Sequence, residues 1–390
     1  MKSIIIDSVE TIKDELLHIS QYIWDNPELG HEEFKAFDIL TDSLKKHHFF
    51  VEEGICDLPT AFRATFDSGK EGPTIGYMCE YDALPEIGHA CGHNLIATMG
   101  LGAGIAISKV IGKTGGKVIV YGTPAEETKG GKVTMAEQGI FDELAVAMMV
   151  HPSSNYQKSG TSLAMDAVQF EYFGKTSHAA ASPEKGINAL DAIIQTFNGI
   201  NALRQHVTSD ARIHGIIPEG GKAANIVPEY AVAQFYVRAK TRSYVNELVQ
   251  KVKNIAEGAA MMTGATMKMS NYELSYDNLV TNETLSTSFT NALVDLGVKK
   301  DEILEESKGY GSLDMGNVSL VCPSIHPYVK ISDTPCPGHT IEFRDAAISE
   351  KGQRTMILAA KALALTGLEV LTNIELLTRI KEEFKLNENK

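Results

Sequence analysis

The stretch TIGYMCEYDALP, residues 74–85, is the first of three segments that share one pattern. A short apolar run with β-branched residues breaks into polar residues and a proline, and KVIVYGTPAEE (117–127) and ELAVAMMVHP (143–152) repeat this. Helix-like segments at 94–112 and 130–141 separate the three. Strands that alternate with helices predict an α/β domain of βαβ units on a mostly parallel sheet, buried on both faces.

Polar groups gather where these three segments end. Glu80 and Asp82 follow the first, Glu126 and Glu127 close the second, and His151 closes the third. Acids are common in loops after strands, so each residue alone has an ordinary explanation. Ligands of such sheets, however, bind beyond the carboxyl ends of the strands. Three ends that carry acids or imidazole together predict a site at one edge of the sheet.

The crossover after the first segment contains GHACGHN (88–94), in which Cys91 stands two residues before His93. An isolated cysteine is most often a buried structural residue. A nucleophilic cysteine would need a base, and a histidine two residues away on a turn is rarely aimed back at the thiol. A metal-binding cysteine needs companions with N, S or O donors, which the strand ends supply. We favour the metal site.

The adjacent acids Glu126 and Glu127 suit two different roles at such a site. Neighbouring side chains of an extended segment point in opposite directions. One carboxylate can then bind a metal while the other stays beside it as a general base. The alternative is a solvated pair at the start of a helix, where the helix dipole favours acids.

A second domain begins at about residue 166. From there the pattern predicts a strand, a helix, two strands, a helix and a strand, which is the βαββαβ order of a ferredoxin-like α+β module. Helices and loops resume after residue 278. The sequence therefore predicts a catalytic domain, residues 1–165 and 279–390, with a lid domain, residues 166–278, inserted into it.

Bulk properties exclude some partners. The formal net charge of −14 argues against binding to nucleic acid or to an anionic membrane surface. The N-terminus does not look like a signal peptide, and no uninterrupted apolar run reaches membrane-spanning length. Five scattered cysteines suit a reducing compartment. We expect a cytoplasmic protein with a small-molecule substrate.

Six motifs occur in one order along the chain and carry a family resemblance. They are CEYDALPEIGHACGHN (79–94), GTPAEE (122–127), VHP (150–152), GKTSHAAASPEKGINALDA (174–192), IHGIIPEGGKAANIVPEYA (213–231) and PGHTIEF (337–343). Together they resemble the dinuclear-metal aminoacylase/carboxypeptidase (M20-type) family of amidohydrolases, and within it the aminobenzoyl-glutamate hydrolase and β-alanyl-dipeptidase subgroup. The resemblance covers nearly the whole chain.

This resemblance implies two divalent metal ions per chain, zinc or alternatively manganese. It assigns Glu126 as the general base and Asp82 as an acid that orients a ligand. The implied metal ligands are Cys91, which would bridge the two ions, His93, Glu127, His151 and His339. His326 is a second candidate for the last position, and we favour His339 because its GHT-x-EF context matches the family better. Other branches have a histidine ligand in an H-x-D motif where this chain has Glu80-Tyr81-Asp82.

The resemblance also assigns residues of the lid. It implies that His214 polarises the scissile carbonyl and that His178 and Asn225 belong to the substrate site. Arg238, at a strand end, is a candidate for binding a substrate carboxylate, although a solvated arginine is equally common there. The glycine-rich stretch that includes Ser312–Asp314 matches a loop near the substrate.

We therefore predict hydrolysis of the amide bond of small N-acyl amino acids or dipeptides. The alternatives are a metal-binding scaffold without efficient turnover and a cysteine hydrolase that uses Cys91. The strand ARIHGII (211–217) would expose isoleucines and unpaired backbone groups if it lay at a sheet edge. Pairing with its twin predicts a homodimer, or a higher homo-oligomer, in which His214 acts on the partner's metals. The competing arrangement is a strand covered by the lid's own helices.

Overall fold

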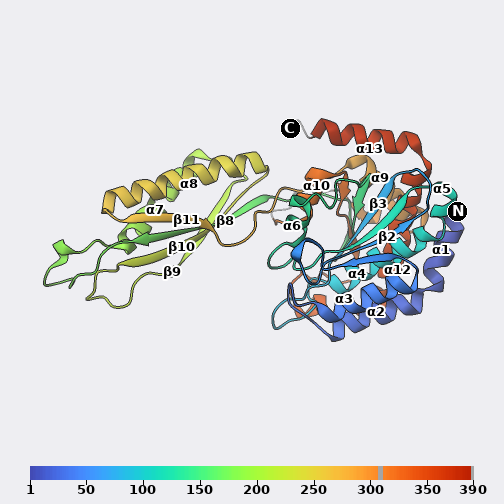
Figure 1. The fold of residues 1–390 in the computed structure, drawn as a ribbon, viewed down its shortest axis with the longest axis horizontal. Coiled ribbons are helices and arrows are strands. Elements are labelled where there is room, and N and C mark those ends of the chain that lie inside the picture. Colours follow the sequence, from blue (N-terminus) through green and yellow to red (C-terminus); the bar gives the residue numbers. More distant parts are fainter. Residues whose placement is uncertain (306–310, 388–390) are drawn as a thin grey trace. The chain divides into compact units, whose positions relative to one another are not determined.

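The computed structural model describes residues 1–305 and 311–387 and divides into two compact units (Figure 1). Unit 1 runs from Met1 to Thr161 and resumes at Leu279, whereas unit 2 is Ser162–Asn278 with Gly311 and Ser312. The sequence placed the start of the inserted domain at residue 166. The unit begins slightly earlier because its first strand already starts at Ala164.

The main sheet of unit 1 has six strands in the order β1-β2-β4-β3-β5-β13. Strand β3 pairs in parallel with β4 and β5, and β13 pairs in parallel with β5. Strand β2 is the exception, because it pairs antiparallel with both of its neighbours, β1 and β4, near one edge. The predicted α/β class with a mostly parallel sheet is confirmed. The strands are β1 (Phe50–Glu53), β2 (Phe62–Asp67), β3 (Thr74–Cys79), β4 (Lys117–Gly122), β5 (Val146–Met148) and β13 (Ser324–Ile325).

Helix α4 (His93–Ser108) makes the crossover from β3 to β4, and every one of its residues is buried. It packs against α12 (Glu350–Thr372), which is long and apolar enough to cross a membrane by length and composition alone. Most of the apolar part of α12, 78%, is buried inside the protein. The other helices of unit 1 are α1 (Lys2–Thr11), α2 (Lys13–Asp25), α3 (Phe34–Lys46), α5 (Ile111–Thr114), α6 (Gly131–Glu137), α9 (Glu283–Asp295), α10 (Met315–Val321), α11 (Ile341–Ala347) and α13 (Ile374–Asn387).

A second, small sheet in unit 1 has the order β12-β7-β14-β6. Strand β6 (His151–Ser153) follows β5 after two residues and pairs in parallel with β14 (Tyr328–Lys330), with His151 opposite Tyr328. The remaining strands are β7 (Tyr156–Gln157) and β12 (Ile303–Leu304). This sheet fixes the direction in which the chain leaves the main sheet at His151.

Unit 2 has the predicted βαββαβ order, and its sheet is antiparallel with the order β11-β8-β10-β9. Helices α7 and α8 lie on the same side of this sheet (Figure 1) and cover Phe235 and Val237 of β10. Tyr236 and Arg238 alternate with them and lie on the open face. Strand β9 forms an edge. The elements are β8 (Ala164–Phe173), α7 (Ala189–Leu203), β9 (Arg212–Glu219), β10 (Tyr230–Ala239), α8 (Arg242–Thr263) and β11 (Thr266–Asn271).

Candidate metal centre

The turn before α4 holds Cys91 and His93 together. Gly92 between them has φ of +79°, a left-handed conformation that favours glycine. A Cβ at Gly92 would lie 2.5 Å from a side-chain carbon of Pro152, the residue after His151. The glycine therefore lets this turn approach the loop that carries His151.

The predicted ligands come together in two groups that share Cys91. Its sulfur, His93 and His151 form one group, and the same sulfur, Glu127 and His339 form the other, with all ligand atoms of a group within 4.8 Å of one another. The Sγ of Cys91 lies 3.3 Å from Nε2 of His151, and Nε2 of His339 lies 3.1 Å from Oε1 of Glu127. A ligand that belongs to both groups is what a bridging role requires. A third group joins His93 to Glu126 and Glu127.

The imidazoles of His93 and His151 are each oriented by a hydrogen bond at Nδ1. Nδ1 of His93 lies 2.9 Å from Oδ1 of Asp82, and the other oxygen of Asp82 accepts the backbone N–H of Glu127 at 3.0 Å. Nδ1 of His151 donates to the carbonyl of Pro152 at 2.7 Å. The Nε2 atoms of both rings therefore face the cluster. In metal sites, ligand histidines are commonly oriented in this way by a hydrogen bond at the other ring nitrogen.

The nitrogen Nε2 of His93 supplies a direct test of whether a metal fits. It is fully buried and makes no hydrogen bond within the described part of the chain, although Oε2 of Glu80 lies 3.5 Å and Oε1 of Glu127 3.9 Å from it. A buried nitrogen without a hydrogen bond is costly, and a bound cation would remove that cost. Thiolate, imidazole and carboxylate are donors that zinc accepts. The residues present therefore fit a metal centre.

The environments of Glu126 and Glu127 shift their pKa values in opposite directions. Burial, together with the charges of Glu80 and Asp314, raises the pKa of Glu126 well above its ordinary value. Burial also acts on Glu127, but the hydrogen bond from His339 and the charge of His93 bring its pKa below the ordinary value. Neighbouring acids whose pKa values are driven apart are suited to different chemical roles.

Glu33 supports this pair and was not foreseen from the sequence. Its buried carboxylate accepts the backbone N–H of Ala125 at 2.9 Å and the hydroxyl of Thr60 at 2.8 Å. Ala125 has φ of +61°, which is unfavourable for a residue with a side chain. Glu33 thus fixes the strained residue directly before Glu126. Burial raises the pKa of Glu33 to about 7.

Lys132 explains the glutamate in the Glu80-Tyr81-Asp82 sequence. Its fully buried ammonium donates to Oε1 of Glu80 at 2.6 Å and to Oδ1 of Asp314 at 2.7 Å. Its backbone N–H donates to the second oxygen of Asp314 at 3.1 Å. A buried charge persists only when it is paired in this way. Glu80 is thereby tied to α6 and to the start of α10, and it is absent from the three donor groups found among the described residues.

The two candidates for the last ligand differ in their surroundings. His326 is buried, and its ring centroid lies 5.4 Å from that of His151. Among the described residues, however, it belongs to none of the donor groups, whereas His339 does. Burial lowers the pKa of His326 to about 3, so it is an uncharged neighbour of the cluster.

The four lid candidates lie in unit 2, three of them exposed. His178 and Asn225 stand in adjacent loops, because the N–H of Ala179 donates to the carbonyl of Asn225 at 3.0 Å. His214 lies on edge strand β9. Arg238 is half-buried, and its guanidinium donates to the hydroxyl of Ser312 at 3.3 Å. Ser312 belongs to unit 2, whereas Asp314 lies in unit 1.

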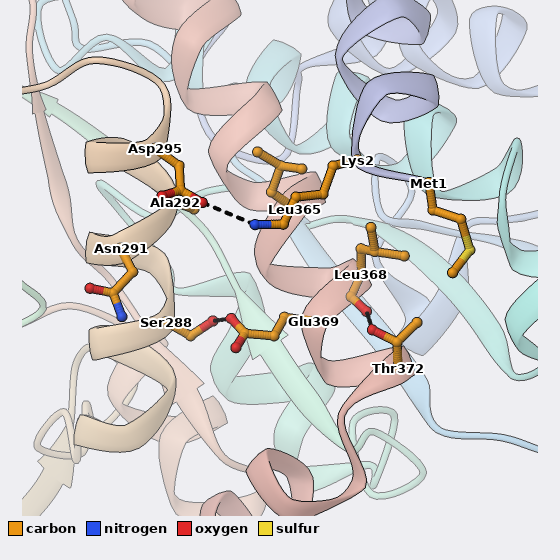
Figure 2. A pocket seen from close by; sticks show the side chains of 10 residues that line it. All are labelled: Met1, Lys2, Ser288, Asn291, Ala292, Asp295, Leu365, Leu368, Glu369 and Thr372. Atoms are coloured by element: carbon orange, nitrogen blue, oxygen red, sulfur yellow. Dashed lines mark hydrogen bonds and ion pairs between the residues drawn. The ribbon is translucent and has the colours of Figure 1, made fainter.

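A surface pocket of about 390 Å³ lies elsewhere in unit 1, among α1, α9 and α12 (Figure 2). Its walls include the ion pair of Lys2 with Asp295, at 3.0 Å, and the hydrogen bond from Ser288 to Glu369, at 2.6 Å. None of the predicted site residues lines it. This pocket is not the candidate site.

A parallel sheet with sulfur, nitrogen and oxygen donors gathered beyond its strand ends, joined to an α+β unit, defines a class of metal-dependent hydrolases. The family model described as the peptidase dimerisation domain matches residues 165–261. The Xaa-Arg dipeptidase of Mus musculus is 37% identical over 401 residues, which cover 97% of this chain and 91% of the relative. One component of the p-aminobenzoyl-glutamate hydrolase of Escherichia coli is 34% identical over 312 residues, or 75% of this chain and 64% of the relative.

A solved structure from Bacillus subtilis, described as a dinuclear metal binding peptidase from the M20 family, has the same fold. Its TM-score is 0.71 at 17% identity, and the match covers 92% of this chain and 99% of the other. The chain belongs to the M20 family of peptidases and amidohydrolases. The predicted family and the predicted enzyme class, a hydrolase of amide or peptide bonds, are confirmed.

Proposed function

We propose that this protein is a two-metal amidohydrolase that cleaves small dipeptides or N-acyl amino acids. The observation that carries the proposal is the pair of donor groups sharing Cys91, with Glu126 beside them. The names of the mouse and Escherichia coli relatives support small peptides and acylated glutamates as substrate classes. The mixed sulfur, nitrogen and oxygen donor set favours zinc, with manganese as the alternative.

Divalent ions bound at this site would polarise the scissile carbonyl and ease the ionisation of water. The chain's own residues do the rest. Cys91 bridges the two groups, and His93, Glu127, His151 and His339 complete them. Asp82 holds His93 in the tautomer that leaves Nε2 toward the cluster. Glu126, whose pKa is raised by burial, accepts the proton of the attacking water and returns it to the leaving amine.

We further propose that the lid completes the site in a homodimer. The matched family model is a dimerisation domain, and edge strand β9 exposes Ile216 and Ile217 beside unpaired backbone groups. Pairing of β9 with its twin would cover both. In this arrangement His214 stabilises the oxyanion at the partner's metals. His178 and Asn225 contact the substrate, and Arg238 binds its carboxylate.

Because Cys91 has to remain a thiol or thiolate, we place the protein in the reducing cytoplasm, which cell fractionation can check. The experiment that tests the function is a hydrolysis panel of dipeptides and N-acyl amino acids with metal-loaded and chelated protein. We expect turnover only with metal. Activity that survives chelation and is lost on thiol alkylation would indicate a cysteine hydrolase. Metal binding without any turnover would indicate a scaffold.

A further inference from the structure

His339 is the one exposed residue among the five predicted metal ligands. Its side chain is 54% exposed, whereas the side chain of its partner Glu127 is 10% exposed. It lies in the loop that joins β14 to α11, and its φ of +64° is unfavourable for a residue with a side chain. An exposed residue in a strained conformation keeps one position only where its surroundings hold it. The contacts of this loop therefore decide whether His339 stays at the cluster.

The hydroxyl of Ser154 holds this loop three residues before His339. It accepts the backbone N–H of Cys336 at 3.0 Å and donates to the carbonyl of the same residue at 2.8 Å. Ser154 directly follows β6, the strand that begins with His151. Pro337, whose φ is fixed by its ring, limits the freedom of the chain between Cys336 and His339. One side chain thus connects the segment that carries His151 to the loop that carries His339.

Other hydrogen bonds hold the loop at His339 and after it. The backbone N–H of His339 donates to the carbonyl of Ala90, the residue before Cys91, at 2.9 Å. The hydroxyl of Thr340 accepts the N–H of Phe343 at 3.3 Å and so caps the start of α11. These bonds fix the loop on one side of the imidazole, and Ser154 fixes it on the other. Without the hydroxyl of Ser154, the chain before His339 is free to relieve the strain at that residue.

We propose that Ser154 is a positioning residue for His339 and thereby sets the affinity for one metal ion, the ion assigned to Glu127 and His339. Removal of the hydroxyl leaves the N–H and the carbonyl of Cys336 without their partner, and the loop then withdraws its imidazole from the cluster. The other donor group, which includes His151, contains no residue of this loop and keeps its ion. This inference rests on the ligand set of the proposed function and deepens it.

The test measures zinc binding to the metal-free protein by competition with a chromogenic chelator. Ser154→Ala should bind one zinc ion as tightly as the wild type does. It should bind the second ion about 10- to 100-fold more weakly, the usual effect of removing a group that orients a metal ligand. The control Ser332→Ala removes a hydroxyl of the same loop that contacts Thr334 within the loop, and it should bind both ions with wild-type affinity.

A second background separates the positioning of His339 from general damage to β6. His339→Ala should bind one zinc ion tightly, and adding Ser154→Ala should leave the affinity for that ion unchanged, because the hydroxyl has no ligand left to position. If the added substitution weakens the remaining ion, Ser154 acts on the group that includes His151 and the assignment is overturned. Wild-type affinity for both ions in Ser154→Ala overturns it as well. If the metal-loaded wild type hydrolyses no dipeptide or N-acyl amino acid but Ser154→Ala still weakens one ion selectively, the proposed function fails and the positioning role stands.

Discussion

The donor cluster of unit 1 and the lid residues of unit 2 differ in how far one chain completes them. His93 is fully buried, and Asp82 and the turn at Gly92 hold it in place. His178, His214 and Asn225 are exposed on unit 2. The donor cluster is held in place by packing and hydrogen bonds within its own unit. Exposed side chains, by contrast, position a substrate only when another molecule or subunit covers them. One chain thus preorganises the donor cluster, whereas the lid residues have the role we propose for them only once a substrate or a second subunit covers them.

The largest effect should come from the two acids after β4. Glu126→Gln should keep both metals and lose turnover by several orders of magnitude, because it removes the general base. Glu127→Gln should lose metal as well as turnover. Metal content by atomic emission and kcat for both variants check this, with Glu137→Gln, an exposed acid of α6, as the control. Metal loss in the Glu126→Gln protein instead would reverse the two roles.

Removing the sulfur of Cys91, which the two donor groups share, also tests the donor cluster of unit 1. Cys91→Ala should bind at least one metal ion fewer per chain and lose most activity, because Cys91 belongs to both donor groups. Cys56→Ala, at a half-exposed cysteine outside the donor groups, is the matched control. Peroxide treatment followed by reloading with metal should destroy more of the recoverable activity of the chelated wild type than of the metal-loaded form, since a bound thiolate is protected. Full metal content in Cys91→Ala would exclude the bridging role.

The lid side is tested by mixing two inactive proteins. His214→Ala should lower kcat about 10²- to 10³-fold, the usual cost of one oxyanion-stabilising donor. If His214 acts on the partner's metals, subunit exchange with Glu126→Gln chains creates heterodimers with one intact site, and activity returns. If it acts within its own chain, every site in the mixture stays defective. A verified heterodimer that remains inactive would therefore refute the trans arrangement.

The sequence predicted the parts of this molecule that follow from periodicity and order. Alternating strands and helices predicted the main sheet, and Asp82, Cys91 and Glu127 could be placed at its edge because strand ends meet there. Pairing over longer distances left no comparable signal. Nothing in the sequence around Lys132 or Glu33 shows that their charges are buried against partners from other elements. Such partners are fixed by tertiary packing, and each looks like an ordinary surface residue in the sequence.

Glu33 gives the smallest and most specific prediction, a change in the pH dependence of stability. Burial raises its pKa from 4.5 to about 7 in the folded protein, so between these values the folded state binds the proton that the unfolded state releases. The free energy of unfolding should therefore fall as pH rises through this window, by an amount on the order of 3 kcal/mol. Glu33→Gln keeps an oxygen for the N–H of Ala125 but cannot ionise, and it should remove this component.

The measurement is urea unfolding of metal-free protein at pH 5, 6, 7 and 8. The fluorescence of Trp24, the only tryptophan, reports on α2 of unit 1. The stability of Glu33→Gln relative to the wild type should increase from pH 5 to pH 7 and level off toward pH 8, because only the wild type has to bury a negative charge, and that charge is nearly complete above the folded pKa. Glu32→Gln, an exposed neighbour, should follow the wild type at every pH. Parallel curves for Glu33→Gln and the wild type would mean that Glu33 ionises freely in the folded protein. In that case its carboxylate would hold the strained Ala125 turn without the energetic cost of burial, and activity should then not depend on its protonation.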